Sequence, residues 1–312
     1  MKTLEQVKKI ESVVLYVLRK FPEGVDYIKL FKIIYFAQKE YLVNYGKVLC
    51  PDTFKARTFG PVPALSDKVI KLVELEEEDI DSYPDLRNFY NSIRVQDQMV
   101  YALAEPDMDY LSRKECEYLD KWYNYCKDKD SKKELSPESH DEAYTKAYTR
   151  YKDDPQLGTL TNIEIAKAGG ATEKMVAYIR EKELMTNGIV PLPGYDTRLK
   201  YVIVAGAKSN SKEVCAVLIN TDNDYSSAPD WQAEQYCIRQ ADYPEILEYD
   251  SWIDCTDPKE LKVSKIKAKE AEKKGRLNPQ DLANVMKHLK ENGFIDNHTR
   301  KVYGIDKYVI EQ

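Results

Sequence analysis

The sequence predicts an α+β protein with two domains. The first is mostly helical and holds a small antiparallel sheet, and the second is a smaller β-rich domain that ends in helices. Helical spacing of apolar residues dominates the first half of the 312-residue chain, and two β-branched runs separated by a short polar stretch follow in the second half. A chain of this length also fits two domains. We therefore divide it into residues 1–150, a linker with a helix at 151–189, and residues 190–312.

Two helices open the N-terminal domain. Residues 3–20 repeat apolar side chains at helical intervals. Residues 26–45 form the strongest predicted helix, with Asp26 as the N-cap and Gly46 just after the last turn. The apolar residues of this second helix line two adjacent faces, which places it in the centre of the domain.

Short strands and further helices complete this domain. The runs KVL and FKARTF, on either side of the CPD turn, predict one hairpin over residues 47–59, and residues 93–103 predict another. Further helices are expected from Ala64 to about residue 79, over 111–126, in two pieces within 131–150, and over 172–183.

The C-terminal domain carries the strongest β signal. KYVIVAGA and EVCAVLINT, joined by KSNSK, predict a hairpin, and EQYCIR predicts a third strand. Helices are expected again from Pro258 onward, and one of them begins at Pro279 and ends at Gly293.

The charge balance argues against a large nucleic-acid footprint. The formal net charge is −6, with 24 basic and 27 acidic residues in 1–150 and 23 and 26 in 151–312. Neither half is basic as a whole, so only a local basic patch is compatible with RNA binding. The chain has 24 Tyr and only 7 Phe, a bias that fits half-buried contact faces and core margins alike.

Cysteine and histidine spacing predicts neither a metal site nor a disulfide framework. The cysteines include no C-x-x-C pair, and the three histidines complete no zinc spacing. The N-terminus lacks a signal-peptide core and no apolar run is long enough to span a membrane. We therefore expect a cytoplasmic protein with reduced thiols, no cofactor and no membrane partner. The six thiols are Cys50, Cys116, Cys126, Cys215, Cys237 and Cys255.

Standard enzyme signatures are missing from the sequence. It contains no Gly-rich phosphate loop, no H-E-x-x-H and no nucleophile elbow. Gly169 and Gly170 precede a helix but follow no strong strand, so they are a weak phosphate site. The acidic run at 74–81 is best explained as a solvated helix end, and His140 as a surface or capping residue.

Four elements of the N-terminal domain occur in a recognisable order: a helix that contains KLFKIIYFAQ, a glycine before a short strand, a Phe-Gly-Pro-Val turn and a late element that ends in histidine. Their residues are Lys29, Leu30, Lys32, Ile33, Tyr35, Phe36, Ala37, Gln38, Gly46, Leu49, Phe59, Gly60, Pro61, Val62, Leu135 and His140. With these elements, residues 5–150 resemble the Panacea domain of SocA-like antitoxins. Ser139 replaces the threonine that usually precedes the histidine in that family.

This resemblance implies a non-enzymatic module that neutralises a toxin by direct contact. An aromatic-rich helix followed by a rigid turn would present a preorganised surface, and Tyr and Arg are favoured at interfaces. The alternative is that many of these aromatic residues build the core of the domain itself. The predicted partner-binding residues are Lys29, Lys32, Tyr35, Phe36, Gln38, Tyr41, Arg57, Phe59, Gly60, Pro61, Val62 and His140.

Three short elements stand out in the C-terminal domain: Ile219 to Thr221 at a strand end, Asp250 to Asp254, and Gly275 to Leu277 before a helix. With these elements, residues 198–292 resemble PemK/MazF-like toxin proteins, more weakly than the first half resembles its family. The resemblance implies an SH3-like barrel and a ribonuclease that uses an acid/base pair and a phosphate-stabilising group. A barrel that only binds is the alternative. The implied catalytic residues are Thr221, Arg239, Asp250 and Asp254, and Lys262 to Arg276 would form a basic stripe for RNA.

These patterns together predict a component of a type II toxin–antitoxin system. An antitoxin module would be fused to a toxin-like domain, and the cognate toxin would be held in cis or in trans. Two alternatives stay open. One is an active RNA endonuclease in the C-terminal half. The other is a proteolytic adaptor that works with a ClpXP-type protease, or a phage-related interaction protein with a role in phage defence.

Overall fold

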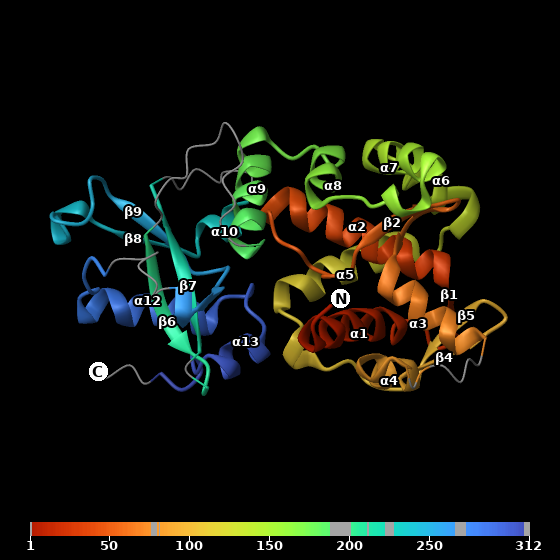
Figure 1. Cartoon of the computed structure of the whole chain (residues 1–312), viewed down its shortest axis with the longest axis horizontal. Coiled ribbons are helices and arrows are strands. Elements are labelled where there is room, and N and C mark those ends of the chain that lie inside the picture. Colours follow the sequence, from red (N-terminus) through yellow and green to blue (C-terminus); the bar gives the residue numbers. More distant parts are fainter. Residues whose placement is uncertain are drawn as a thin grey trace. The chain divides into compact units, whose positions relative to one another are not determined.

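The computed structural model describes residues 2–75, 80, 82–187, 201–210, 212–221, 228–265 and 273–308. The chain divides into two compact units. The N-terminal unit comprises residues 1–111 and 115–190, and the C-terminal unit comprises residues 112–114 and 191–312. Each unit has its own buried core (Figure 1).

Helix α2 (Tyr27–Tyr45) is the centre of the N-terminal unit, as predicted. The Asp26 side chain caps it by accepting a hydrogen bond from the Lys29 amide, and Gly46 ends it at φ 59°. Helix α1 (Leu4–Leu18) packs against α2 and begins with a capping box formed by Thr3 and Gln6. Because α2 is apolar on adjacent faces, α1, α8 and strand β3 all pack on it.

Two small antiparallel sheets flank these helices. The first has the order β1-β5-β4, and β4 and β5 form the predicted hairpin through a turn in which Asp97 and Gln98 both have positive φ. The second pairs β2 with β3 and places the hairpin turn at residues 58 and 59. The strands are β1 (Val25–Asp26), β2 (Phe54–Arg57), β3 (Gly60–Pro63), β4 (Ile93–Gln96) and β5 (Met99–Ala102).

The predicted hairpin around residues 47–59 is therefore wrong in its register. Residues 47–49 form no strand, and β2 pairs with the Gly-Pro-Val-Pro segment that follows it. Prolines at Pro61 and Pro63 hid this strand from the sequence pattern, because proline cannot donate to a sheet ladder. A two-stranded ribbon has two edges, so β3 tolerates both prolines.

Short helices enclose the rest of the N-terminal unit. Residues 151–187, predicted as part of a linker, pack here as the end of α7, the turn η5, and helices α8 and α9. The elements are α3 (Ala64–Glu74), η2 (Pro84–Leu86), α4 (Arg87–Asn91), η3 (Met108–Tyr110), α5 (Arg113–Cys126), η4 (Ser131–Leu135), α6 (Ser136–Glu138), α7 (Glu142–Asp153), η5 (Pro155–Leu157), α8 (Asn162–Ala168) and α9 (Glu173–Asn187).

The C-terminal unit is built on a five-stranded antiparallel sheet. The strand order is β10-β7-β9-β8, with β6 also paired to β7, and the predicted β6–β7 hairpin is confirmed. The pairings of the described strands leave this sheet open and show no closure into the expected SH3-like barrel. The strands are β6 (Val202–Ala207), β7 (Glu213–Asn220), β8 (Gln235–Ile238), β9 (Ser251–Asp254) and β10 (Lys259–Lys262).

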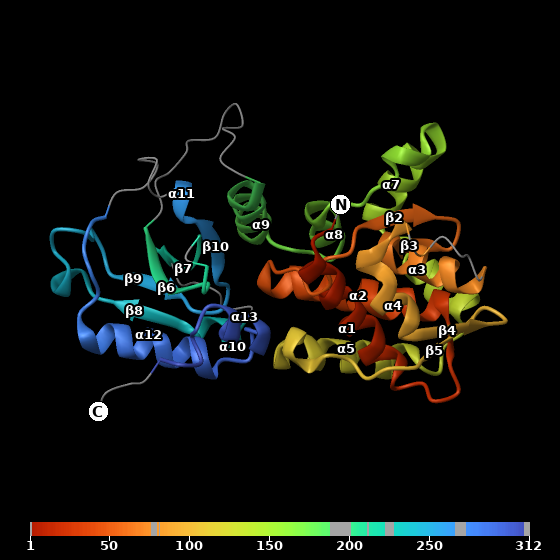
Figure 2. The ribbon, with the colours of Figure 1, turned by 60° about the horizontal axis from the view of Figure 1, so that its bottom comes forward.

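Helix α12 (Pro279–Glu291) lies along β8 in both ribbon views (Figures 1 and 2). Its buried residues Val285, Met286 and Leu289 share one core with β7, β8 and β9. The predicted opening of this helix at Pro279 is correct, with Asn278 as the N-cap. The other short elements are α10 (Pro229–Gln232), η6 (Gln240–Asp242), α11 (Val263–Lys265) and α13 (Asn297–Val302).

All six cysteines are free thiols. Within the described parts of the chain, no helix has the length and apolar character needed to cross a membrane.

Candidate protein-interaction site

Five of the predicted partner-binding residues lie in the core rather than on the surface. Their side chains belong to α2 and are at most 1% exposed. Side chains buried to this degree make no direct contact with a partner. The prediction that these five residues form part of the contact surface is therefore wrong. The position of α2 between the other elements is the physical reason. The residues are Lys32, Tyr35, Phe36, Gln38 and Tyr41.

Polar groups among these buried residues instead tie α2 to distant segments. The Tyr35 hydroxyl donates to Asp141 Oδ2 at 2.7 Å, and Lys39 Nζ donates to the same oxygen at 3.0 Å. The other oxygen of Asp141 accepts from the Tyr144 amide at 3.0 Å and so caps α7. One carboxylate therefore fixes the start of α7 against α2.

Gln38 and the aromatic rings have similar structural roles. Gln38 Oε1 accepts from the amides of Leu49 and Cys50, each at 2.9 Å, and so holds the segment that follows α2. The Phe36 ring lies 5.0 Å from the ring of Trp122, and Tyr41 packs edge-on against Tyr45 and Tyr118.

The exposed part of the family motif is the hairpin tip, which we define as residues 57–62. Arg57 pairs with Gly60, so Thr58 and Phe59 form a two-residue turn, and Phe59 is 45% exposed. Gly60 has φ 101°, and a Cβ built on it would lie 2.3 Å from Ser139 Oγ and 2.6 Å from Lys32 Nζ. Glycine is required here for both the backbone conformation and the close approach.

Three side chains from the helices under the hairpin donate hydrogen bonds to the backbone carbonyls of the tip. Lys32 Nζ donates to the Pro61 carbonyl at 3.1 Å, and Ser136 Oγ donates to the Phe59 carbonyl at 3.1 Å. The Tyr144 hydroxyl donates to the Arg57 carbonyl at 3.0 Å. Burial lowers the pKa of Lys32 to about 7, because the charged form loses its hydration. The tip is thus a preorganised turn anchored to α2, α6 and α7.

Exposed side chains gather beside the tip. The His140 ring stacks on Tyr144 with ring centres 4.2 Å apart, and Lys132 Nζ lies 5.5 Å from the centre of the Phe59 ring. Burial and the nearby Lys32 lower the pKa of His140, whereas Asp141 opposes this shift. We call Arg57, Phe59, Lys132 and His140 the tip surface.

A ladder of parallel rings extends this surface along α7. Tyr144, Tyr148 and Tyr151 continue the stack from His140 at centre distances of 5.2 and 5.7 Å, and the Arg57 guanidinium lies 5.0 Å from the Tyr151 ring. Both ribbon views show α7 beside β2 (Figures 1 and 2). The ladder was missed in the sequence, although the i, i+4, i+7 spacing of its three tyrosines was available as a signal.

The remaining predicted residues of this set lie near the tip or at the start of α2. Pro61 is buried and Val62 is half-buried in β3. Lys29 is half-buried, and its Nζ donates to the Lys127 carbonyl at 2.9 Å. These residues support the turn and the first part of α2.

The predicted catalytic residues of the C-terminal unit do not form one cluster. Thr221, Arg239 and Asp250 lie just beyond the Asn220, Ile238 and Ser251 ends of three neighbouring strands, at the same end of the sheet. Asp254 lies at the other end of β9, about 13 Å along the strand from Asp250 at the usual rise per residue.

Asp254 is also occupied by internal hydrogen bonds. It is 1% exposed, and its Oδ1 accepts from Gln235 Nε2, the Thr256 amide and the Thr256 hydroxyl. The Thr256 hydroxyl in turn accepts from Trp231 Nε1 at 2.8 Å. Through this network Asp254 holds Gln235 and Thr256 in the core of the C-terminal unit. Of the predicted RNA stripe at 262–276, residues 266–272 lie outside the described part of the chain.

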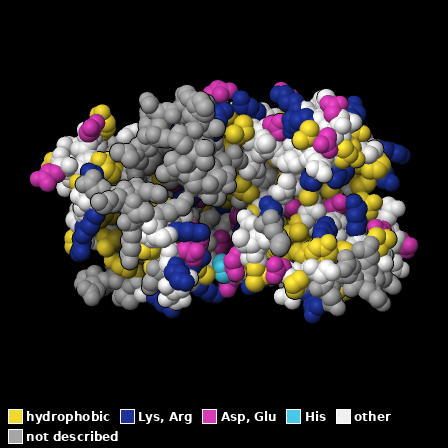
Figure 3. Space-filling model, viewed as in Figure 1, with side chains coloured by type: hydrophobic (Ala, Val, Ile, Leu, Met, Phe, Trp, Pro, Cys, Tyr) yellow, Lys and Arg dark blue, Asp and Glu magenta, His cyan; other side chains and the backbone are white. Residues whose placement is uncertain are grey.

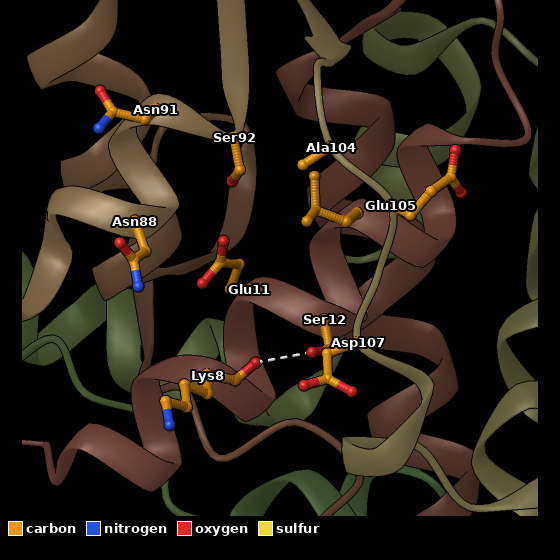
Figure 4. Close-up of a pocket in the computed structure, with 10 residues that line it drawn as sticks. Lys8, Glu11, Ser12, Asn88, Asn91, Ser92, Ala104, Glu105 and Asp107 are labelled. Carbon is orange, nitrogen blue, oxygen red and sulfur yellow. Dashed lines mark hydrogen bonds between the residues drawn. The ribbon is translucent and has the colours of Figure 1, made fainter.

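A cavity of about 420 Å³ lies in the N-terminal unit, between α1, α4 and the segment after β5. Figure 4 shows the Glu11 carboxylate directed toward Ser92. Burial raises the pKa of Glu11, as does Asp107, whereas a hydrogen bond with Ser92 opposes the shift. Glu11, Glu105 and Asp107 outnumber the single basic residue, Lys8. This lining disfavours phosphate and other anions.

No set of side chains within the described ranges has a metal-binding arrangement. On the face that Figure 3 presents, basic and acidic side chains are interspersed and form no continuous basic field. The tip surface is suited to contacting another protein through the exposed Phe59 ring, the Lys132 ammonium beside it, the His140 imidazole and the Arg57 guanidinium over Tyr151.

Residues 30–144 match the family model described as antitoxin SocA-like, Panacea domain. The match begins in α2 and ends in α7, so the Panacea segment contains Lys32, the hairpin tip, Lys132 and His140. The predicted resemblance is confirmed over these residues. The separate comparisons with curated proteins and with solved structures found no match.

The Panacea segment also contains supporting residues that the sequence did not single out. Ser136, Asp141 and Tyr144 hold the tip and α7, and Lys132 flanks Phe59. They lie close to Leu135 and His140 in the chain, but the tip and α2 that they hold are 77 to 106 residues away, so no local pattern pointed to these contacts.

Proposed function

We infer that this protein is an antitoxin-type component of a toxin–antitoxin system, and that its N-terminal unit neutralises a protein toxin by direct contact through the tip surface. The observation that carries the proposal is the exposed Phe59 ring on a turn whose carbonyls are held from below, within the segment that matches the Panacea model. A turn ordered before binding loses little entropy on association.

The toxin is proposed to be either the C-terminal unit of a chain of this kind or a separately encoded toxin-like protein. An in-cis arrangement is motivated by the resemblance of residues 198–292 to PemK/MazF-like toxins. The five-stranded sheet of the C-terminal unit agrees with this resemblance in being a small β-rich fold.

Co-expression in bacteria tests the proposal. The full chain is expressed together with residues 191–312 as a separate chain, or with the product of a neighbouring toxin-like reading frame. Wild type should restore growth, and Phe59→Ala should weaken neutralisation at least about ten-fold, because truncating an anchor ring at an interface costs about 2 kcal/mol or more. Binding is measured in parallel by co-purification.

Leu103→Ala is the matched control, since Leu103 is another exposed apolar side chain, at 58%. It should neutralise as wild type does. Full neutralisation by the Phe59→Ala protein would refute the proposal that the tip surface contacts the toxin. Absence of growth arrest from residues 191–312 would remove the in-cis version. Tyr35→Ala is unsuitable as a contact test, because Tyr35 is buried and its loss would disturb the fold.

Ribonuclease activity of the C-terminal unit is a second candidate. It is favoured by the gathering of Thr221, Arg239 and Asp250 at one end of the sheet. Arg239→Ala in the full chain should then abolish cleavage of single-stranded RNA, measured on gels. Wild-type protein that leaves RNA intact would refute this candidate.

A further inference from the structure

Lys32 is a buried basic residue at the meeting point of three elements. It belongs to α2, and the tip of β2–β3 and the η4–α6 segment pack on that helix. The side chain is 1% exposed, and its Nζ donates to the Pro61 carbonyl. Among the described residues, no carboxylate lies within ion-pair distance of Lys32.

The tip lies directly on this amine. The position that a Gly60 Cβ would take is 2.6 Å from Lys32 Nζ and 2.3 Å from Ser139 Oγ. Ser139 Oγ donates to the Ser136 carbonyl at 2.7 Å, and Ser136 Oγ donates to the Phe59 carbonyl. The carbonyls on both sides of Gly60 are therefore held from beneath, one by Lys32 and one by the serines.

We propose that Lys32 is the positioning residue of the tip surface: the neutral amine holds the turn closed, and the ammonium form releases it. This inference rests on the proposed function for its biological meaning, since the tip surface is the proposed contact with the toxin. Its consequence is that partner binding weakens as the pH falls below neutrality.

The physical reason is the cost of a buried charge. An ammonium group needs three hydrogen-bond acceptors or water, and an uncompensated charge in the interior is strongly unfavourable. Burial brings the pKa of Lys32 to about 7. Below this pH, conformations that let water reach Nζ gain stability, and the tip contacts Nζ directly through Gly60 and the Pro61 carbonyl.

Charged groups face Lys32 from α2, from the hairpin and from the segment between η4 and α7. On η4, Lys132, Lys133 and Glu134 are exposed. On α2, Tyr35 and Lys39 are both bound to Asp141. From the α6–α7 side, His140 is close enough for Lys32 to lower the pKa of its imidazole. On the hairpin, the Arg57 guanidinium lies over the Tyr151 ring. An experiment must therefore distinguish titration of His140 from titration of Lys32.

Nuclear magnetic resonance of the free full chain provides the test. Lysine side chains are labelled with ¹³C at Cε, backbone amides with ¹⁵N, and spectra are recorded from pH 5.5 to 8.5. We expect one lysine to titrate with a midpoint within about one unit of pH 7, well below an ordinary lysine. The Gly60 amide shift should follow the same midpoint.

Lys32→Met should abolish the Gly60 titration, and His140→Gln should retain it. A Gly60 titration that persists in Lys32→Met, or disappears in His140→Gln, would overturn the inference. If Lys32→Met does not fold, the titration of the wild-type chain is the test. The inference is then overturned if no lysine titrates below pH 9, or if one lysine does so while the Gly60 amide shift stays unchanged. No toxin is present in these measurements, so their failure is distinct from failure of the neutralisation test.

Discussion

The two units place their motif residues in opposite ways. In the N-terminal unit, residues far apart in sequence converge on one exposed turn, with buried Lys32, Ser136 and Tyr144 beneath an exposed Phe59. In the C-terminal unit, the motif Asp250–Asp254 spreads along a single strand, and its buried end is satisfied by neighbouring residues. Buried side chains that hold an exposed ring in place favour a binding surface in the N-terminal unit. A buried carboxylate that accepts hydrogen bonds from nearby core residues favours a structural role in the C-terminal unit.

The largest effect that distinguishes the two units is expected at Gly60. Gly60→Ala should lower the free energy of unfolding by about 2–4 kcal/mol, because it adds backbone strain to a clash with Ser139 and Lys32. Urea unfolding of the full chain measures the loss.

Gly170 is the matched control for this substitution. It has φ 86°, but a Cβ built on it meets no atom within 4 Å. Gly170→Ala should therefore lose only about 1 kcal/mol from the backbone conformation. Equal losses at the two glycines would mean that the close packing under the tip contributes nothing to stability.

A smaller effect is expected from the two aspartates of the C-terminal unit. Asp254→Ala should lower the free energy of unfolding by about 2–3 kcal/mol, because buried donors of Gln235 and Thr256 lose their acceptor. Asp250→Ala should lower it by about 0.5 kcal/mol, since Asp250 is exposed and accepts a hydrogen bond from the Gln240 amide at the surface. The opposite ranking, read from urea unfolding, would reverse the structural assignment of Asp254.

The smallest effect is expected from one hydroxyl in the N-terminal unit. Tyr35→Phe removes the hydrogen bond to Asp141 but leaves Lys39 on the same carboxylate. We expect a loss of about 1 kcal/mol in the free energy of unfolding. Tyr249→Phe is the control, because Tyr249 is 60% exposed, and it should leave the unfolding curve unchanged. Equal curves for both variants would show that Tyr35 does not secure α7.

Protonation of Lys32 adds a pH dependence with a defined sign. Its folded-state pKa of about 7 lies below the unfolded value, so the unfolded chain binds more protons between these two values. Stability contributed by this group therefore rises with pH from about 7 upward and is lost as the pH falls toward 7.

Much of the fold could be predicted from local patterns. The apolar spacing and caps of α2, the β4–β5 and β6–β7 hairpins, and the start of α12 at Pro279 are all confirmed. Each depends on residues close together in the chain. The predicted hairpin at 47–59 was wrong because Pro61 and Pro63 conceal β3, an edge strand that pairs with β2 on one side only.

The candidate site could be predicted only in part. The motif identified the tip and Lys32, but a pattern of residues does not tell which side chains are exposed. Tyr35 and Phe36 carry the family resemblance and are nevertheless buried. The supports at Ser136, Asp141 and Tyr144 come from a segment about eighty residues or more beyond the tip or α2, and only the fold brings them together.

Asp141 has a consequence for the order of folding. It joins the start of α7 to Tyr35 and Lys39 on α2, across sequence separations of 106 and 102 residues. Closing so long a loop costs conformational entropy before any contact offsets it. The helices α2 and α7 are therefore expected to form first, with this carboxylate docking afterwards, so that substitutions at Asp141 would mainly speed unfolding and leave the folding rate almost unchanged.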